Sequence, residues 1–314
     1  MIDIPSKRVR LLSWIKSSHV LAPVKILIPD ILKRGVLGIV AGGKQGTISL
    51  GDGSILKYNL DDSYWARHAR DIRAYEPEMW FVADHYLKSN TIFVDCGANI
   101  GLWSCYAASK IKNRDQVIAV EPGDSILPLL RQNHALNGAT FTLLENAVWN
   151  RSGETKTFIV HRGHASSSLV EEDSDNKPVH RASVLTISID DIVRRALEKA
   201  PSAVNVVVKL DVEGVERQAL DGALHTLSKK NMLFIYEDHG RDLASETTTH
   251  FLNTGLNIYF IDDTICTVRA ITNSRELCGI KTNPGKGYNF IACKPSSEFD
   301  KEFFRLCRGM APKV

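Results

Sequence analysis

The chain has 314 residues, of which 44% are hydrophobic and 24% are charged, and its formal net charge is +3. This length accommodates one large domain, or one domain with a smaller appendage. The composition is typical of a soluble globular protein. The positive charge is too small to indicate nucleic-acid binding, and no segment approaches the length of a transmembrane helix.

The six cysteines are scattered along the chain, without a C-x-x-C pair or a Cys/His cluster at zinc spacing. Free thiols are typical of a reducing compartment. The N-terminus shows no clear signal-peptide core. We therefore expect a cytoplasmic protein.

Residues 1–34 mix basic and apolar positions, and Pro23 and Pro29 divide them into short helical pieces. We interpret this segment as a helical cap packed on the core. The alternative is an amphipathic surface that contacts anionic lipid or a partner subunit. Peripheral membrane contact and a homo-oligomer therefore stay open as predictions for this segment.

Residues 35–60 alternate between apolar and polar positions and contain two glycine-rich turns, which predicts β-hairpins. Residues 61–88 are rich in aromatic side chains and are expected to form helices. We predict that residues 1–85 form an N-terminal cap of helices and β-hairpins.

From residue 91 the pattern becomes strand, helix, strand. Strands are expected at 92–94, 117–120, 141–144, 205–210, 233–236, 258–261 and 288–293, and an added pair at 155–160 and 184–189. Helices are expected at 102–111, 125–136, 190–198, where Asp190 and Asp191 provide the N-cap, and 216–229. This succession predicts an α/β domain at 86–314, with a doubly wound, mostly parallel sheet that ends in an antiparallel hairpin.

The stretch at 91–101, T-I-F-V-D-C-G-A-N-I-G, predicts a strand, a glycine turn and a helix N-terminus. Unpaired backbone N–H groups at such a turn suit a polar ligand. Gly97 is expected to let the backbone approach the ligand, and Gly101 to let the helix pack on the strand. Ala98 and Asn99 replace glycines of the NAD fingerprint, which disfavours NAD. Asp95 suits a positively charged ligand, such as the sulfonium end of S-adenosylmethionine.

Polar side chains end every central strand of the expected sheet, where ligands of open α/β sheets collect. They are Asp95, Glu121, Glu145 and Asn146, Asp211 and Glu213, and Glu237, Asp238 and His239. Glu121 lies at a suitable distance after the glycine turn to accept protons from two ribose hydroxyls. Asn146 is a candidate partner for an adenine amino group, with Ala147 leaving room for the ring.

Four segments together resemble the FkbM family of S-adenosylmethionine-dependent methyltransferases: V-D-C-G-A-N-I-G, A-V-E-P, I-S-I-D-D-I and V-K-L-D-V-E-G-V-E-R-Q-A-L-D-G. The resemblance covers residues 75–293, including Tyr75-Glu76-Pro77, and residues 209–214 make it specific. It implies a class I fold with seven strands, the last antiparallel, and O-methylation of acceptors such as sugars or polyketide-type natural products. The expected cofactor-binding residues are Glu76, Asp95, Gly97, Ala98, Asn99, Gly101, Glu121 and Asn146.

Methyl transfer to a hydroxyl gains from a base that accepts the hydroxyl proton. Asp211 and Glu213 are candidates for that base, and the same pair could hold a divalent cation such as Mg²⁺. Capping of the following helix is the structural alternative for Glu213. His239 is a second candidate base, because imidazole titrates near neutral pH.

The predicted function is O-methylation of a hydroxyl on a sugar, a glycan or a natural-product-type small molecule. An NAD-dependent oxidoreductase and a non-catalytic cofactor-binding or scaffold protein are the alternatives. The chain has no N/D-P-P-Y run and no basic stripe, so we expect no nucleic-acid partner. The acceptor pocket is expected between the hairpins at 35–60 and the loop at 161–183.

Overall fold

The computed structural model describes residues 44–51, 53–160, 180–262 and 267–309. The predictions for residues 1–34, for 35–43 and for most of the loop at 161–183 lie outside the described residues. Within the described part of the chain, no helix combines the length and hydropathy needed to cross a bilayer.

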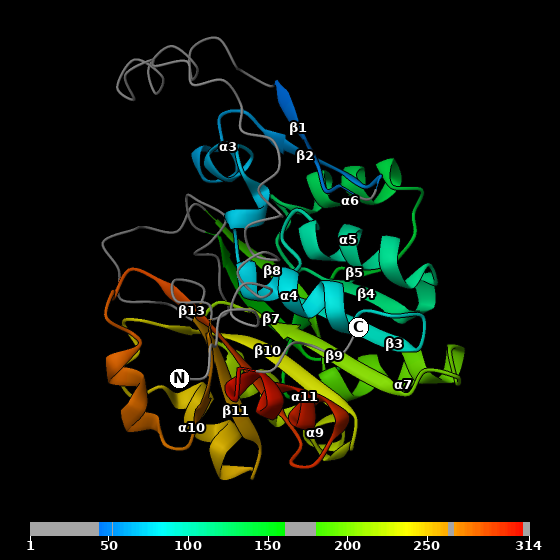
Figure 1. Cartoon of the computed structure of the whole chain (residues 1–314). Helices are drawn as coiled ribbons and strands as arrows, with labels where there is room; N and C mark the ends of the chain where they lie inside the picture. The colour runs from blue at the N-terminus through cyan, green and yellow to red at the C-terminus, as the bar shows by residue number, and fades with distance from the viewer. Residues whose placement is uncertain (1–43, 52, 161–179, 263–266, 310–314) are drawn as a thin grey trace.

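One large sheet forms the centre of the molecule (Figure 1). Its strands are β3 (Thr91–Cys96), β4 (Val117–Val120), β5 (Thr142–Leu144), β9 (Asn205–Leu210), β10 (Met232–His239), β11 (Asn257–Asp262), β12 (Thr267–Ile271) and β13 (Gly287–Cys293). Their order is β12-β11-β13-β10-β9-β3-β4-β5. Neighbours from β10 to β5 pair in parallel, whereas β13 runs antiparallel between β10 and β11. The seven predicted strands and the antiparallel last strand are confirmed, and β12 is an eighth strand at the edge.

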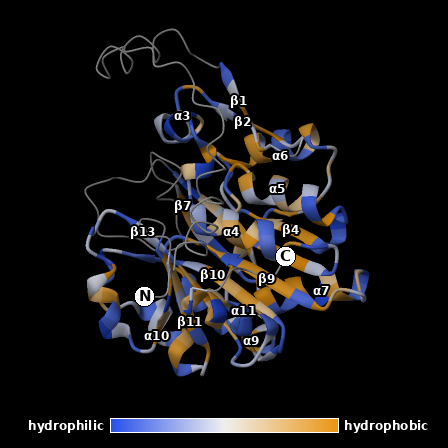
Figure 2. Ribbon diagram, viewed as in Figure 1, coloured by the Kyte–Doolittle hydropathy of each residue, from blue (hydrophilic) through white to orange (hydrophobic). Residues whose placement is uncertain are grey.

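Helices cover both faces of the sheet. On the first face lie α4 (Pro77–Tyr86), α5 (Leu102–Ile111), α6 (Leu127–Leu136) and α11 (Glu298–Cys307), and on the second α7 (Ile189–Lys199), α8 (Glu216–Asp221), α9 (Leu224–Ser228) and α10 (Glu246–Asn253). Successive strand residues alternate between the faces, so Phe93 packs on the first face and Ile92 and Val94 on the second. Figure 2 shows that β9 and β10 are largely hydrophobic, as strands buried on both sides should be.

The described part of the N-terminal region packs on the first face. It comprises the hairpin of β1 (Gln45–Ser49) and β2 (Ile55–Asn59), then α3 (Ser63–His68) and the short 3₁₀ helix η1 (Ile72–Ala74). Asn133 on α6 fastens the hairpin, because its Oδ1 accepts from the Lys57 N–H at 2.7 Å. The predicted hairpin and helices are confirmed. The division between residues 1–85 and 86–314, at the end of α4, stays a prediction.

The added strand pair belongs to a separate three-stranded sheet. β6 (Ala147–Val148), β7 (Thr155–Val160) and β8 (His180–Ile187) are arranged in the order β6-β8-β7. β7 and β8 pair with each other, as predicted, and they run antiparallel. Two further 3₁₀ helices, η2 (Arg114–Gln116) and η4 (Ser274–Gly279), complete the described elements.

Two helix predictions are wrong in detail. Ser188, rather than Asp190 or Asp191, caps α7, and its Oγ accepts from the Asp191 N–H at 3.2 Å. Asp190 instead accepts from the Thr226 N–H at 2.7 Å, near the start of α9. The helix expected at 216–229 is broken between α8 and α9, where a Cβ on Gly222 would lie 2.4 Å from the Trp149 carbonyl oxygen.

Candidate functional site

A cavity of about 940 Å³ opens at the carboxyl ends of β3, β4, β9 and β10. The loops after these strands form one part of its wall. The segment from α3 to the start of α4 and the residues 283–287 form a second part, and Ala147, Val148, Phe158 and Asn289 also line the cavity. The volume lies at the upper end of the range for sites that bind small molecules and cofactors, roughly 300–1,000 Å³.

Strand alternation gathers charged groups at one face of this sheet edge. Val207 on β9 packs on the first face, and so Lys209 has the same orientation. Ile235 on β10 also packs on the first face, which places Glu237 and His239 there. All three charged residues line the cavity.

Lys209 is the positive centre of the wall. It is only 5% exposed, and its Nζ donates to Asp211 Oδ2 at 2.7 Å. On the neighbouring strand, Asp95 is its register partner. Burial lowers the pKa of Lys209, but Asp211, Glu76 and Asp95 together raise it well above its usual range. The ammonium group is therefore held charged among three carboxylates.

Asp95 lies beneath the cavity wall. It is 1% exposed, and its Oδ2 accepts from the Ser104 hydroxyl at 2.6 Å. Burial raises the pKa of Asp95, and the nearby Lys209 opposes that rise. The predicted cofactor residue thus acts on the site through Lys209, whereas its side chain is not part of the wall that a ligand would meet.

Glu76 lines the cavity at the start of α4. Its backbone is left-handed, with φ at 45°, a conformation that is uncommon for a residue other than glycine. Its Oε2 accepts from the Trp103 indole N–H at 2.6 Å. Burial raises the pKa of Glu76, and Lys209 opposes the rise. The structure therefore brings this predicted residue to the wall.

The glycine turn has a different physical basis from the one expected. Gly97 has φ at 83°, and a Cβ there would lie 1.8 Å from the Asp211 carbonyl oxygen. Gly101 has φ at 91°, and a Cβ there would lie 2.7 Å from Leu130 Cδ1 on α6. Gly97 thus allows contact with the loop after β9, and Gly101 allows contact with α6 rather than with the strand.

The backbone N–H groups of this turn are already paired. Those of Gly97 and Ala98 both donate to the Val120 carbonyl at 3.0 Å. The N–H of Asn99 donates to Glu121 Oε2 at 2.9 Å. For Gly97, Ala98 and Asn99 the expectation of unpaired donors is therefore wrong, although all three residues line the cavity.

Glu121 joins two loops of the wall. Its Oε2 accepts from Asn99, and its Oε1 accepts from the Gly123 N–H at 2.8 Å. Burial raises the pKa of Glu121 to about 7, and these two N–H groups oppose the rise. Each carboxylate oxygen can accept a second hydrogen bond. The Glu121 carboxylate can therefore stay hydrogen-bonded to the backbone of both loops and also accept hydrogen bonds from the hydroxyl groups of a ligand.

Asn146 does not line the cavity. Its Nδ2 donates to the Leu185 carbonyl on β8 at 3.1 Å, so the predicted contact with adenine is not supported. Beside Glu121, the cavity wall forms an apolar slot. It is lined by Ile126, Ala147, Val148 and Phe158.

Three carboxylates meet on the opposite part of the wall. One oxygen from each of Asp211, Glu213 and Glu237 lies within 4.8 Å of the others. His239 Nε2 lies 3.1 Å from Glu237 Oε2 and 3.7 Å from Glu213 Oε2. We refer to Asp211, Glu213, Glu237 and His239 as the acid cluster.

Three members of the acid cluster, Glu213, Glu237 and His239, have raised pKa values. The Glu213 side chain raises the pKa of His239 to about 9 against the effect of burial, and Glu237 adds to the rise. Burial raises the pKa of Glu213, which His239 opposes. Burial and Asp211 place the pKa of Glu237 well above its usual range. His239 is therefore protonated at neutral pH.

The three carboxylates of the acid cluster offer the oxygen ligands that a divalent cation prefers.

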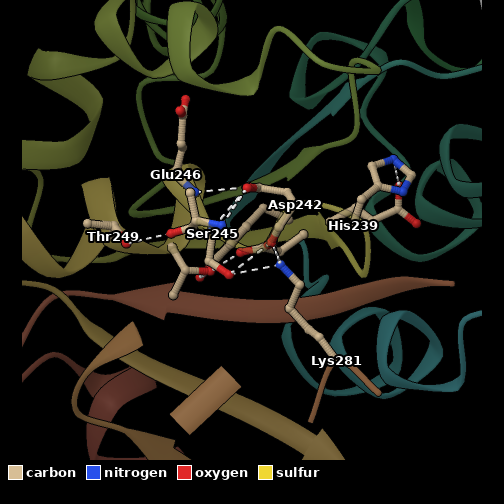
Figure 3. Close-up of polar contacts among 11 residues, drawn as sticks. His239, Asp242, Ser245, Glu246, Thr249 and Lys281 are labelled. Atoms are coloured by element: carbon tan, nitrogen blue, oxygen red, sulfur yellow. Dashed lines mark hydrogen bonds and ion pairs between the residues drawn. The ribbon is translucent and has the colours of Figure 1, made fainter. Parts of the chain in front are cut away.

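A second charged network fixes the end of β10 from the second face (Figure 3). Asp238 points away from the cavity and accepts from Thr248 Oγ1 at 2.5 Å. Lys281 contacts the Asp238 carboxylate and the Asp242 carbonyl, and its Nζ donates to Ser245 Oγ at 2.8 Å. Asp238 is thus structural, and this network anchors the chain just before the cavity-lining residues 283–287.

Several wall residues escaped prediction from the sequence. They are Tyr64, Tyr75, Phe158 and Lys209. Lys209 carried a usable signal, because a lysine inside the apolar run at 205–210 requires buried carboxylate partners. Glu237 was expected at the end of a strand, but its place beside Asp211 and Glu213 was not predicted.

The family model described as Methyltransferase FkbM domain matches residues 95–255, slightly more than half of the chain. No curated protein matches the chain.

Three solved structures are similar to the chain. The FkbM methyltransferase from Methylobacillus flagellatus KT is 14% identical, with 84% of this chain and 58% of that chain covered and a TM-score of 0.36. For precorrin-6y C5,15-methyltransferase from Geobacter metallireducens GS-15, the identity is 13%, the coverage 70% and 89%, and the TM-score 0.38. An S-adenosylmethionine-dependent O-methyltransferase from Thermotoga maritima is 11% identical, with 71% of this chain and 67% of that chain covered and a TM-score of 0.37.

Proposed function

The chain belongs to the FkbM methyltransferase family, and from that premise we propose that this S-adenosylmethionine-dependent methyltransferase methylates a hydroxyl oxygen. The acceptor is a sugar, a glycan or a natural-product-type small molecule. The observation that carries this proposal is the acid cluster, because its carboxylates can accept the proton that a hydroxyl must lose.

The residues of the cavity fit the cofactor. Glu121 would hold the ribose hydroxyls, and the apolar slot beside it, which includes Val148 and Phe158, suits a flat adenine ring. Glu76 and Asp211 supply negative charge for the sulfonium and ammonium groups. When bound, S-adenosylmethionine supplies an electrophilic methyl group.

Within the acid cluster, Glu213 is the best base for the acceptor hydroxyl. Its raised pKa brings proton acceptance closer to neutral pH, which suits general-base catalysis. Protonated His239 orients Glu213 and is poorly suited to act as the base itself. Lys209 holds Asp211, which leaves Asp211 as a hydrogen-bond acceptor that orients the hydroxyl. Most of the remaining rate enhancement would come from positioning.

We expect the protein to bind S-adenosylhomocysteine, the demethylated product of the cofactor, and to bind NAD far more weakly. Pyrophosphate needs free backbone N–H groups at the glycine turn, and those of Gly97, Ala98 and Asn99 are paired within the chain. Isothermal titration calorimetry with each ligand measures the difference. Tighter binding of NAD would overturn the proposal and favour an oxidoreductase.

The affinity for S-adenosylhomocysteine should rise between about pH 6 and about pH 8. The pKa of Glu121 is about 7, so the group loses its proton in this range and becomes an acceptor for both ribose hydroxyls. Glu121→Gln should weaken binding about 10- to 100-fold at pH 8 and flatten this pH dependence.

Calorimetry across this pH range tests the role of Glu121, and thermal unfolding shows whether the variant folds. Glu145→Gln is the matched control, because Glu145 pairs with Arg131 and does not line the cavity. If the pH dependence persists in Glu121→Gln, another group binds the ribose.

A non-catalytic cofactor-binding protein is the alternative class, and formation of S-adenosylhomocysteine in the presence of an acceptor separates it from an enzyme. We also propose a cytoplasmic location without a nucleic-acid partner. The scattered cysteines support the location, and those in the described residues are free thiols. Membrane contact through residues 1–34 and homo-oligomerisation stay predictions.

A further inference from the structure

Aromatic side chains form a continuous wall on the part of the cavity built by α3 and η1. Tyr64, Trp65, His68 and Tyr75 all line the cavity, and we call them the aromatic wall. The ring centroids of Tyr64 and His68 are 4.8 Å apart, and those of His68 and Tyr75 are 4.6 Å apart. Trp65 packs edge-on against Tyr64 and Tyr75, each at 5.6 Å. The wall is thus a rigid, packed surface.

The aromatic wall and the acid cluster share the same part of the cavity. Tyr64 Oη donates to Tyr75 Oη at 3.0 Å, which fixes the two rings relative to each other. Burial raises the pKa of Tyr64 to about 12, and the carboxylates of Glu76, Asp211 and Glu237 add to that rise. A molecule beside the wall would therefore lie near Asp211 and Glu237, two members of the acid cluster.

The cavity lining also carries polar and basic side chains, and the basic ones include Arg67, Arg241 and Lys286. Asn283 and Asn289 contribute amides, and Asn289 Nδ2 donates to Glu78 Oε1 at 2.9 Å. Val212 and Val215 are the aliphatic residues that follow β9, whereas the other aliphatic residues of the described lining are Leu102, Val120, Ile126 and Val148. A polyketide needs a broad aliphatic surface to replace its contacts with water. A sugar ring needs a flat apolar platform for its C–H face and acceptors for its hydroxyls.

We propose that the aromatic wall and the acid cluster together form the acceptor subsite, and that the acceptor is a pyranose sugar. The apolar face of the sugar ring stacks on the aromatic wall through dispersion and weak C–H···π contacts. The hydroxyls face Asp211, Glu213 and Glu237. This inference rests on the proposed function and selects one of its acceptor classes.

The aromatic wall lies outside the family match at 95–255. The methyl-transfer machinery of the family would thus receive its sugar specificity from the N-terminal segment around α3.

Saturation-transfer NMR on the protein saturated with S-adenosylhomocysteine tests the subsite. The probes are the methyl pyranosides of glucose, galactose, mannose and xylose, with sorbitol as a polyol that has hydroxyls but no ring. Tetramethylammonium is the probe for the alternative that aromatic and acidic groups form a cation site. We expect saturation transfer to the ring protons of at least one pyranoside, and little to sorbitol or tetramethylammonium.

Variants locate the binding on the wall. Tyr64→Leu should weaken binding of that pyranoside about three- to tenfold, whereas Tyr64→Phe, which keeps the ring, should retain most of it. Phe304→Leu is the control, because Phe304 is a 51% exposed aromatic residue on α11 and does not line the cavity.

The proposal is overturned if the wild type transfers saturation to none of the pyranosides, or if sorbitol or tetramethylammonium gives the stronger signal. Unchanged pyranoside affinity in Tyr64→Leu would also overturn it. Calorimetry with S-adenosylhomocysteine on the same samples tests the proposed function separately from the acceptor subsite. Cofactor binding without sugar binding refutes only the subsite, whereas loss of both refutes the proposed function.

Discussion

Replacing Glu213 with Gln should lower kcat by about 10²–10⁴-fold and leave the affinity for S-adenosylhomocysteine nearly unchanged. Glutamine keeps the shape of the side chain and its ability to hydrogen-bond, but it cannot accept the proton of the acceptor hydroxyl. The backbone at this position is left-handed, with φ at 50°, and the strain of this conformation is similar for glutamate and glutamine. Formation of S-adenosylhomocysteine with a sugar acceptor gives kcat, and calorimetry gives the affinity.

Glu216→Gln is the matched control for this experiment. Glu216 is also a buried carboxylate at the start of α8, and burial raises its pKa to about 7. Its Oε1 accepts from the Gly214 N–H at 3.2 Å, and the side chain does not line the cavity. We expect its replacement to change stability more than kcat.

Treatment of the wild type with EDTA distinguishes a base from a cation site in the acid cluster. If Glu213 acts as a base, EDTA should leave turnover unchanged. Loss of turnover with EDTA and its recovery with Mg²⁺ would show that Asp211, Glu213 and Glu237 hold a divalent cation. If Glu213→Gln keeps full activity and EDTA has no effect, Asp211 and then His239 become the bases to test.

The elements of the fold could be predicted because their apolar periodicity is local. The end of β10 could not, because its length is set by pairing with a distant strand. The antiparallel register continues to the pair His239 and Gly287, where a Cβ on Gly287 would lie 1.4 Å from Glu237 Oε1. That pairing places Glu237 and His239 on one face, and a single sequence does not reveal it.

The residue types of the cofactor site were predicted better than their roles. Gly97 was expected to make room for a ligand, but the absence of a Cβ there makes room for the Asp211 carbonyl, which is distant in sequence. Asn146 follows β5, which is an edge strand rather than a central one, and its amide is bonded to β8. Asp95 belongs to the charge centre around Lys209 rather than to the wall. In each case a contact between distant segments decides the role.

Lys209→Met should reduce the free energy of unfolding by roughly 3–5 kcal/mol at pH 8, because it leaves Asp95, Asp211 and Glu76 without their buried cation. Lys209 has a raised pKa in the folded state, so its contribution is fully present below the pKa of an unfolded lysine. The deficit of the variant should shrink at about pH 5. Protonation of the raised-pKa carboxylates Asp95 and Glu76 then removes part of the uncompensated charge.

Denaturation with urea at both pH values measures the deficit of Lys209→Met. The double variant Lys209→Met with Asp211→Asn should recover part of the lost stability, since it removes one carboxylate that contacts the ammonium group directly. A deficit that is equal at both pH values, with no recovery in the double variant, would mean that Lys209 stabilises the fold by packing alone. The charge of this buried lysine would then have no part in holding the acids at the cavity wall.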